Sequence, residues 1–288
     1  DLNENSVSNA QTDAIGQSSD PPNRGNTITG SFQGFSGTAT LQQNNGDANS
    51  LNAGTAVLTA SGADDVTQNI GVIGSVTDSN LDDGLSPDTS TERTNLLEGS
   101  TGNNTSDGIL TVQQNNGDGN VLGSGTGVVV NTGGIATDET TQNITANGTV
   151  DGNTVSHDDE LTDPVGKRDN TISNSFKSDG SGVATVQQNN GNGNVMSAGT
   201  GVVVDRENTN RSTSGGDTVE PVVTQATSTD GTVTSNTGDQ DDTSGAAGFT
   251  RENTINQNAF RDYDGVASVQ QNNGDNNAVL SSTSVRVN

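Results

Sequence analysis

Alternating apolar and polar positions recur at four places along the chain and indicate short β-strands. The apolar pairs, each separated by one residue, are Ala39 and Leu41, Leu110 and Val112, Ala184 and Val186, and Ala267 and Val269. A period of two puts both members of a pair on one face of a strand. No segment shows a helical period, and glycine and β-branched residues are common throughout. The pattern predicts an all-β protein with almost no helix.

Each of these strands leads into the amide-rich motif Gln-Gln-Asn-Asn-Gly. The motif begins at Gln42, Gln113, Gln187 and Gln270, so successive copies are 71, 74 and 83 residues apart. A Thr-Gln marker at Thr67, Thr141 and Thr224 stands 46 residues before the next motif in every case, whereas the distance from motif to marker grows from 25 to 28 to 37. The constant half of the repeat is expected to be packed structure, and the growing half an exposed loop.

An Arg-x-Asn marker precedes every motif, at Arg24, Arg93, Arg168 and Arg251. Dividing the chain at its asparagine gives an N-terminal arm (1–25), three units (26–94, 95–169 and 170–252) and a truncated fourth unit (253–288). Such internal repetition is typical of architectures that stack similar layers. We therefore expect a solenoid-like stack of short strands. The alternative is an antiparallel β-sandwich built from Asn-Gly hairpins.

The motif itself is interpreted as structural. Asn-Gly is a strong turn signal because both residues tolerate positive φ, and identical amides in adjacent layers can donate to one another as ladders. The turn and ladder residues are Asn45, Gly46 and Asn49; Asn116, Gly117 and Asn120; Asn190, Gly191 and Asn194; and Asn273, Gly274 and Asn277. Glycines 117 and 191 are expected at left-handed positions.

This motif resembles curlin-type repeats, which occur in secreted bacterial fibre proteins. The amide–Gly–Asn spacing of those repeats is matched by Asn115, Gly117 and Asn120, and again by Asn272, Gly274 and Asn277. The chain departs from the pattern because Asn replaces the first Gln, the Ala is displaced and the unit is about three times longer. The resemblance covers roughly ten residues per unit. It implies an extracellular structural fibre with inward-pointing amides.

Composition narrows the functional classes. Only 26% of residues are hydrophobic and 2% are aromatic, so the core must be thin and built from small side chains. The net charge of −26 argues against nucleic acid and anionic membranes as partners, because both attract basic surfaces. The chain has no cysteine and no apolar run long enough for a membrane span.

Three acidic stretches are candidate calcium sites, because Ca²⁺ prefers several carboxylate oxygens. Their residues are Asp82, Asp83 and Asp88; Asp158, Asp159, Glu160 and Asp163; and Asp239, Asp241 and Asp242. None of the three matches the EF-hand spacing, and solvated loops are the alternative. The single histidine, His157, lies in such a loop, and no phosphate-binding glycine motif is present. We therefore do not expect an enzyme.

A further expectation concerns assembly. The chain starts at Asp1, which suggests a processed, exported protein located outside the cell or on its surface. The fourth unit stops before its Thr-Gln strand, and the arm carries Val7, Ala10, Ala14 and Ile15. We expect this arm to dock on the open end of another copy, near Val285 and Val287, and to produce a head-to-tail homopolymer.

The sequence thus favours a secreted structural subunit of a filament, pilus or matrix fibre. The alternative is a calcium-dependent adhesin that binds a glycan or a cell surface. A polysaccharide lyase is disfavoured, because the chain has few of the basic and aromatic residues that line the grooves of such solenoid enzymes.

Overall fold

The computed structural model describes twenty strands and the turns that connect some of them. The described residues are 7–8, 12–14, 24–29, 37–60, 66–77, 80–83, 92–98, 108–132, 139–152, 154–157, 167–173, 175, 181–206, 222–234, 237–240, 250–256 and 264–287. None of them forms a helix, so this part of the chain contains no helix that could cross a membrane. The expected all-β class is confirmed.

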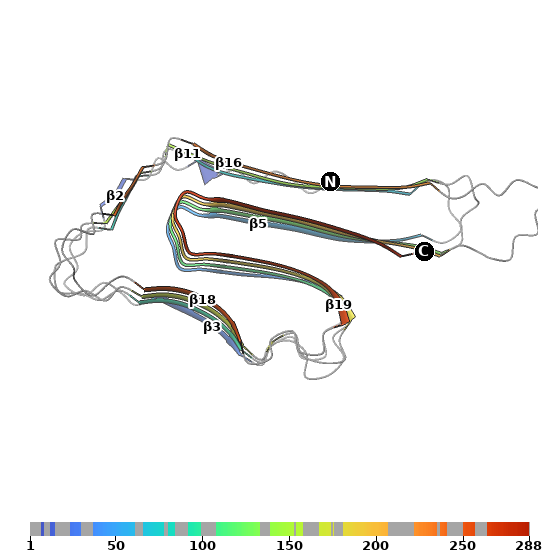
Figure 1. Cartoon of the computed structure of the whole chain (residues 1–288), viewed down its shortest axis with the longest axis horizontal. Coiled ribbons are helices and arrows are strands. Elements are labelled where there is room, and N and C mark those ends of the chain that lie inside the picture. Colours follow the sequence, from blue (N-terminus) through green and yellow to red (C-terminus); the bar gives the residue numbers. More distant parts are fainter. Residues whose placement is uncertain are drawn as a thin grey trace, which may run out of the picture.

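The strands form four successive layers of five strands each (Figure 1). Layer 1 contains β1 (Val7–Ser8), β2 (Thr12–Ala14), β3 (Arg24–Thr29), β4 (Gly37–Asn44) and β5 (Ser50–Ala60). Layer 2 contains β6 (Val66–Thr77), β7 (Asn80–Asp83), β8 (Glu92–Glu98), β9 (Gly108–Asn115) and β10 (Val121–Thr132). Layer 3 contains β11 (Glu139–Asp151), β12 (Thr154–His157), β13 (Lys167–Ser173), β14 (Ser181–Asn189) and β15 (Val195–Arg206). Layer 4 contains β16 (Val222–Thr234), β17 (Thr237–Gln240), β18 (Thr250–Asn256), β19 (Asp264–Asn272) and β20 (Ala278–Val287).

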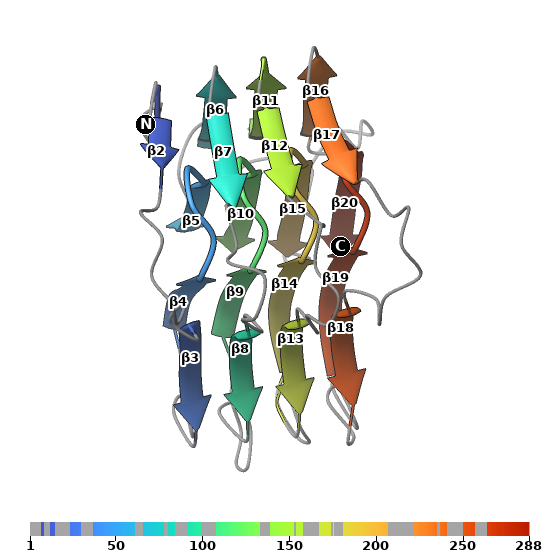
Figure 2. The ribbon, with the colours of Figure 1, turned by 90° about the vertical axis from the view of Figure 1, so that its left-hand side faces the viewer.

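Corresponding strands of successive layers pair in parallel and in register, which produces five four-stranded sheets (Figure 2). We name them the Thr-Gln sheet (β1, β6, β11, β16), the corner sheet (β2, β7, β12, β17), the Arg-Asn sheet (β3, β8, β13, β18), the first arc sheet (β4, β9, β14, β19) and the second arc sheet (β5, β10, β15, β20). The register aligns the repeats residue by residue, for example Gln113 with Gln42 and Gln187. The solenoid-like stack is therefore the observed fold.

The antiparallel sandwich is not observed, because every pairing between the described strands is parallel. The chain does reverse at the amide motif, but β4 and β5 belong to different sheets and do not hydrogen-bond as a hairpin. Each strand instead finds its partners in the layers above and below. The turn is an arc that joins two facing sheets (Figure 1).

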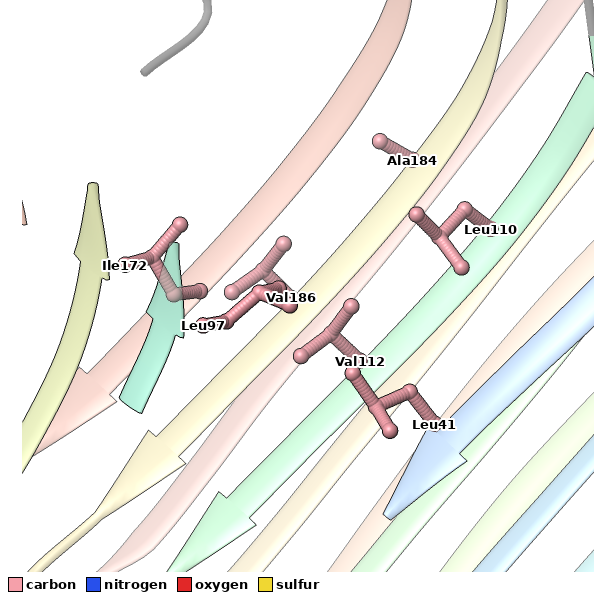
Figure 3. Packing of buried hydrophobic residues seen from close by; sticks show 7 residues of the cluster. All are labelled: Leu41, Leu97, Leu110, Val112, Ile172, Ala184 and Val186. Carbon is pink, nitrogen blue, oxygen red and sulfur yellow. The ribbon is translucent and has the colours of Figure 1, made fainter. Parts of the chain in front are cut away.

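Four sheets pack face to face in the order Thr-Gln, second arc, first arc, Arg-Asn (Figure 1). Alternate residues of the first arc sheet therefore enter different cores. Leu41, Val112 and Val186 pack with Leu97 and Ile172 of the Arg-Asn sheet (Figure 3). Neighbouring positions such as Ile109 and Val183 pack instead with Val202 of the second arc sheet. Because both arc sheets are covered on both faces, a thin core of Val, Leu, Ile and Thr is sufficient.

The boundaries predicted at residues 26, 95, 170 and 253 fall inside β3, β8, β13 and β18. A structural layer instead begins with the Thr-Gln strand, which the N-terminal arm supplies for layer 1. Val7 aligns with Val76 in β6, and Ala14 aligns with Asp82 in β7. In the structure these parts of the arm are therefore paired within their own chain; Ala10 and Ile15 lie outside the described residues.

Candidate functional site: the polar arc and the end layers

The arc between β4 and β5, with its three copies, is the most polar buried region in the described part of the chain. In layer 2, Gln113, Gln114, Asn115, Asn116 and Asn120 all have no exposed surface. Buried amides are costly unless each oxygen and each NH₂ group has a partner. The stacking of identical layers supplies those partners, because each amide lies beside its own counterpart.

Glutamine ladders run along both motif positions, in opposite directions. Gln42 Nε2 donates to Gln113 Oε1 at 2.9 Å, and Gln113 donates onward to Gln187 at 2.9 Å. The neighbouring ladder donates backwards, from Gln114 to Gln43 at 2.7 Å. Gln187 continues the first ladder to Gln270 at 2.8 Å. The amide dipoles of the two ladders therefore oppose each other.

Asparagine ladders fasten the arc to the Arg-Asn sheet. Asn116 Nδ2 donates to the carbonyl oxygen of Asp169 at 2.8 Å, to Asn170 Oδ1 at 3.0 Å and to Asn190 Oδ1 at 3.2 Å. Asn45 and Asn190 make the corresponding contacts one layer away on either side. The turn residue Asn120 also belongs to a column, since Asn194 N–H donates to its Oδ1 at 2.7 Å. Asn49 and Asn277 occupy the outer positions of the same column.

The Asn-Gly glycines are required for a reason that differs from the predicted one. Gly117 and Gly191 do not have positive φ; the left-handed positions are Ala48, Gly119, Gly193 and Asn276, two residues farther along each turn. A Cβ added to Gly46, Gly117 or Gly191 would instead overlap the carbonyl oxygen of the glycine in the next layer. The prediction of left-handed glycines was wrong, because the turn places its strained residue after the aspartate position.

A charged column that the sequence analysis did not identify lines the arc. Arg93 Nη1 donates to both carboxylate oxygens of Asp118, at 2.7 and 2.9 Å. Arg168 Nη2 reaches Asp118 Oδ2 from the next layer at 3.2 Å, and its Nη1 donates to Asn192 at 2.7 Å. The Arg-x-Asn marker was recognised only as a repeat boundary. Its separation from the turn position that it binds, which varies only from 23 to 25 residues, was the available signal.

The environment of Asp118 gives a pH prediction. Burial raises the pKa of this carboxyl, but Arg93, Arg168 and the Asp47 N–H outweigh burial and hold the pKa below its ordinary value of 3.8. A lowered native pKa contributes stability above the unfolded-state pKa and loses it as pH falls through the native value. We expect the difference in unfolding free energy between wild type and Asp118→Asn to be constant from about pH 7 to pH 5 and to shrink below about pH 4. Denaturant titrations of both proteins test this; a difference independent of pH down to the acid limit would contradict it.

Layers 1 and 4 are the two ends of the stack, so the residues there have a neighbouring layer on one side only. The exposed large apolar residues of the described chain are Val57 in layer 1, Val269, Leu280 and Val287 in layer 4, and Ile73 in layer 2. Val269 is 44% exposed, whereas its column partners Val112 and Val186 are fully buried. The exposure of Val269 arises because no further layer covers it. Val285, in β20 of the same layer, is partly buried.

The candidate calcium residues are only partly described. Asp82 and Asp83 lie on β7 and Asp239 lies on β17, with Ser156 between Asp82 and Asp239 in the register. Asp88, Asp158, Asp159, Glu160, Asp163, Asp241 and Asp242 lie outside the described residues. Within the described part of the chain, no three His, Asp or Glu side chains are grouped so that they could hold a metal ion.

Comparisons of the chain with protein-family models, with curated proteins and with solved structures found no match.

Proposed function

We propose that this protein is a structural subunit that polymerises head to tail, with layer 4 of one copy stacking in register on layer 1 of the next, to form an extracellular filament or matrix fibre. The observation that carries the proposal is that the arc and Arg-Asn columns end in the same residues on both end faces. The column residues shared by layers 4 and 1 are Arg251 and Arg24, Asn253 and Asn26, Gln270 and Gln42, Gln271 and Gln43, Asn272 and Asn44, Asn273 and Asn45, Gly274 and Gly46, Asp275 and Asp47, and Asn277 and Asn49.

The proposed contact would repeat hydrogen bonds that already join the layers within one chain. Val195 N–H donates to the Asn277 carbonyl at 2.9 Å, and Asn190 N–H donates to the Asn272 carbonyl at 3.0 Å. By the same geometry, Ala278 N–H of one copy would donate to the Asn49 carbonyl of the next copy. The glutamine ladder would continue from Gln270 to Gln42 in the same way. An exposed strand edge of this kind is a template for another chain.

The charged column does not oppose the contact. Stacking layer 4 on layer 1 places Asp275 next to Asp47. Two aspartates of neighbouring layers, Asp47 and Asp118, already lie side by side in this way inside the chain. There the Asp47 N–H donates to Asp118 Oδ1 at 2.7 Å, and Arg24 and Arg93 bind the two carboxylates. Arg251, which binds Asp275 at 2.8 and 2.9 Å, and Arg24 would have the same roles at the junction.

The contact is heterologous, so it propagates as an open filament unless the rotation between copies closes a ring. Continuous amide ladders along such a filament would resemble those of cross-β assemblies, which are very resistant to dissociation. The acidic composition is consistent with a location outside the cell. This contact between end layers takes the place of the connector first expected from the arm, part of which is already paired in its own chain.

Gly274→Ala tests the proposal with the least disturbance of the monomer. Within the chain, the new Cβ would approach Nδ2 of the flexible Asn277 side chain to 2.5 Å, so that side chain must shift, and it would make an ordinary contact with Asn272 Oδ1 at 3.8 Å. In a filament it would overlap the Gly46 carbonyl of the next copy, as a Cβ on Gly191 would overlap the carbonyl of Gly274. We expect a folded monomer with wild-type circular dichroism that does not elongate, measured by light scattering and electron microscopy.

Gly71→Ala is the matched control, because a Cβ at Gly71 meets nothing within 4 Å. This variant should elongate like wild type. Elongation of Gly274→Ala at the wild-type rate would show that the copies do not stack in register at the arc. A wild-type protein that stays monomeric at high concentration would refute the proposed function itself.

A further inference from the structure

The four Asn-Gly pairs are equivalent in sequence but not in their surroundings. Asn45, Asn116 and Asn190 are buried, and each side-chain NH₂ donates to three acceptors in its own neighbourhood. Asn273 lies in the last layer and is exposed. Among the described residues, its side chain has one hydrogen bond, accepted from Asn190 Nδ2 at 3.5 Å. Its carboxamide is therefore the one in this column that is free to turn.

An Asn-Gly pair with a mobile carboxamide can react with itself. The backbone nitrogen of the glycine attacks the asparagine Cγ and loses its proton, and the side-chain nitrogen leaves as ammonia. The resulting five-membered succinimide is opened by water at either carbonyl, which yields aspartate or isoaspartate. Glycine favours the attack because it has no side chain to obstruct the ring. Water is the only reagent that the reaction consumes.

We propose that Asn273–Gly274 is a site of spontaneous deamidation, and that its conversion ends growth at the layer 4 face. The attacking nitrogen is only weakly held, since Gly274 N–H donates to Asn272 Oδ1 at 3.3 Å. The buried pairs would have to break several bonds before the carboxamide could turn. The second half of the proposal rests on the proposed head-to-tail contact; the first half does not.

Conversion changes the chemistry of the face. In the stacked contact, Asn273 Nδ2 would donate to the Gly25 carbonyl, to Asn26 Oδ1 and to Asn45 Oδ1 of the next copy, as Asn190 donates to Glu252, Asn253 and Asn273 within the chain. An aspartate offers only acceptors, so it would bring a negative charge against three oxygens. Isoaspartate would also lengthen the backbone and displace Gly274. A subunit already covered by the next copy is protected, and an uncovered one has a limited period in which it can add a subunit.

The first measurement is site-resolved deamidation of dilute, folded monomer held in mildly alkaline buffer, followed by peptide mass spectrometry. Asn273 should convert on the order of a hundredfold faster than Asn116 and Asn190, because those two must first break additional hydrogen bonds. Similar rates at the three sites, or faster conversion at Asn116, would overturn the assignment. This readout does not depend on polymerisation.

The second measurement compares elongation of Asn273→Asp with that of Asn69→Asp, after confirming that both are folded. Asn69 is exposed on β6 in layer 2, not on the layer 4 face, and its Oδ1 accepts from Asn143, so the control adds the same charge and keeps its bond. Asn69→Asp should elongate and Asn273→Asp should not. Equal elongation of both variants would overturn the end-capping role. Failure of the wild type to polymerise would refute the proposed function as well as this role, and would leave the deamidation result standing.

Discussion

Gly191→Ala is expected to destabilise the protein by at least about 3 kcal/mol. The new Cβ would overlap the backbone carbonyl of Gly274 in the next layer, and a backbone atom cannot move aside as a side chain can. The overlap can be removed only by separating layers 3 and 4 at the arc, which would break the glutamine and asparagine ladders between these two layers. Urea denaturation followed by circular dichroism measures the loss.

The matched control for Gly191→Ala is again Gly71→Ala. Gly71 aligns with Thr145 and Ser228, so its column already accommodates side chains. Its stability should change by less than about 0.5 kcal/mol. If the Gly191 and Gly71 variants were equally stable, the close approach of the layers at the arc would not be a feature of the protein in solution.

Arg93→Met is expected to cost about 3 kcal/mol, because it removes the two-bond partner of the buried Asp118 carboxylate and leaves only Arg168, at 3.2 Å, to balance the charge. The side chains of Arg93 and Asp118 are 9% and 1% exposed, so solvent cannot replace the lost bonds. Adding Asp118→Asn to this variant should restore part of the loss. Layer 3 supports that expectation, since Asn192 naturally occupies the same position and accepts from Arg168 at 2.7 Å.

Arg24→Met is the matched control for Arg93→Met, because it removes the same kind of ion pair from an end layer. The side chains of Arg24 and Asp47 are 33% and 35% exposed, and the loss should be about 1 kcal/mol or less. Denaturant unfolding of wild type, Arg93→Met, Asp118→Asn and the double variant gives the coupling energy between Arg93 and Asp118. Equal losses at Arg93 and Arg24 would contradict the role assigned to burial.

Much of the architecture was predictable from the spacing of motifs. The alternation of Ala39 with Leu41, repeated three times, indicated strands, and the constant interval between Thr-Gln and the amide motif indicated packed repeats. Both follow from local periodicity, which depends on the backbone and not on distant contacts. The stack of layers was expected for the same reason, because a repeat with few apolar residues can bury them only against its own copies.

The partners of the strands and the role of each polar residue depended on the tertiary structure. Asn45 and Gly46 are compatible with a hairpin turn and with an arc, because both kinds of turn reverse the chain. Only the pairing of β4 with β9 in the next layer shows that the turn is an arc. The assignment of Arg93 to Asp118 needed the Arg-Asn sheet to lie beside the turn.

The sequence by itself determined that this protein is an acidic, all-β chain with internal repeats and that its amide motif occurs once in each repeat. Composition, strand periodicity and motif spacing can all be counted along the chain without knowing which segments are in contact. The tertiary structure decided that those amides are buried, that the glycines are needed for the close approach of layers and that the arc columns end in the same residues on both end faces. Those properties depend on which layer lies next to which, and the parallel register between layers sets that arrangement.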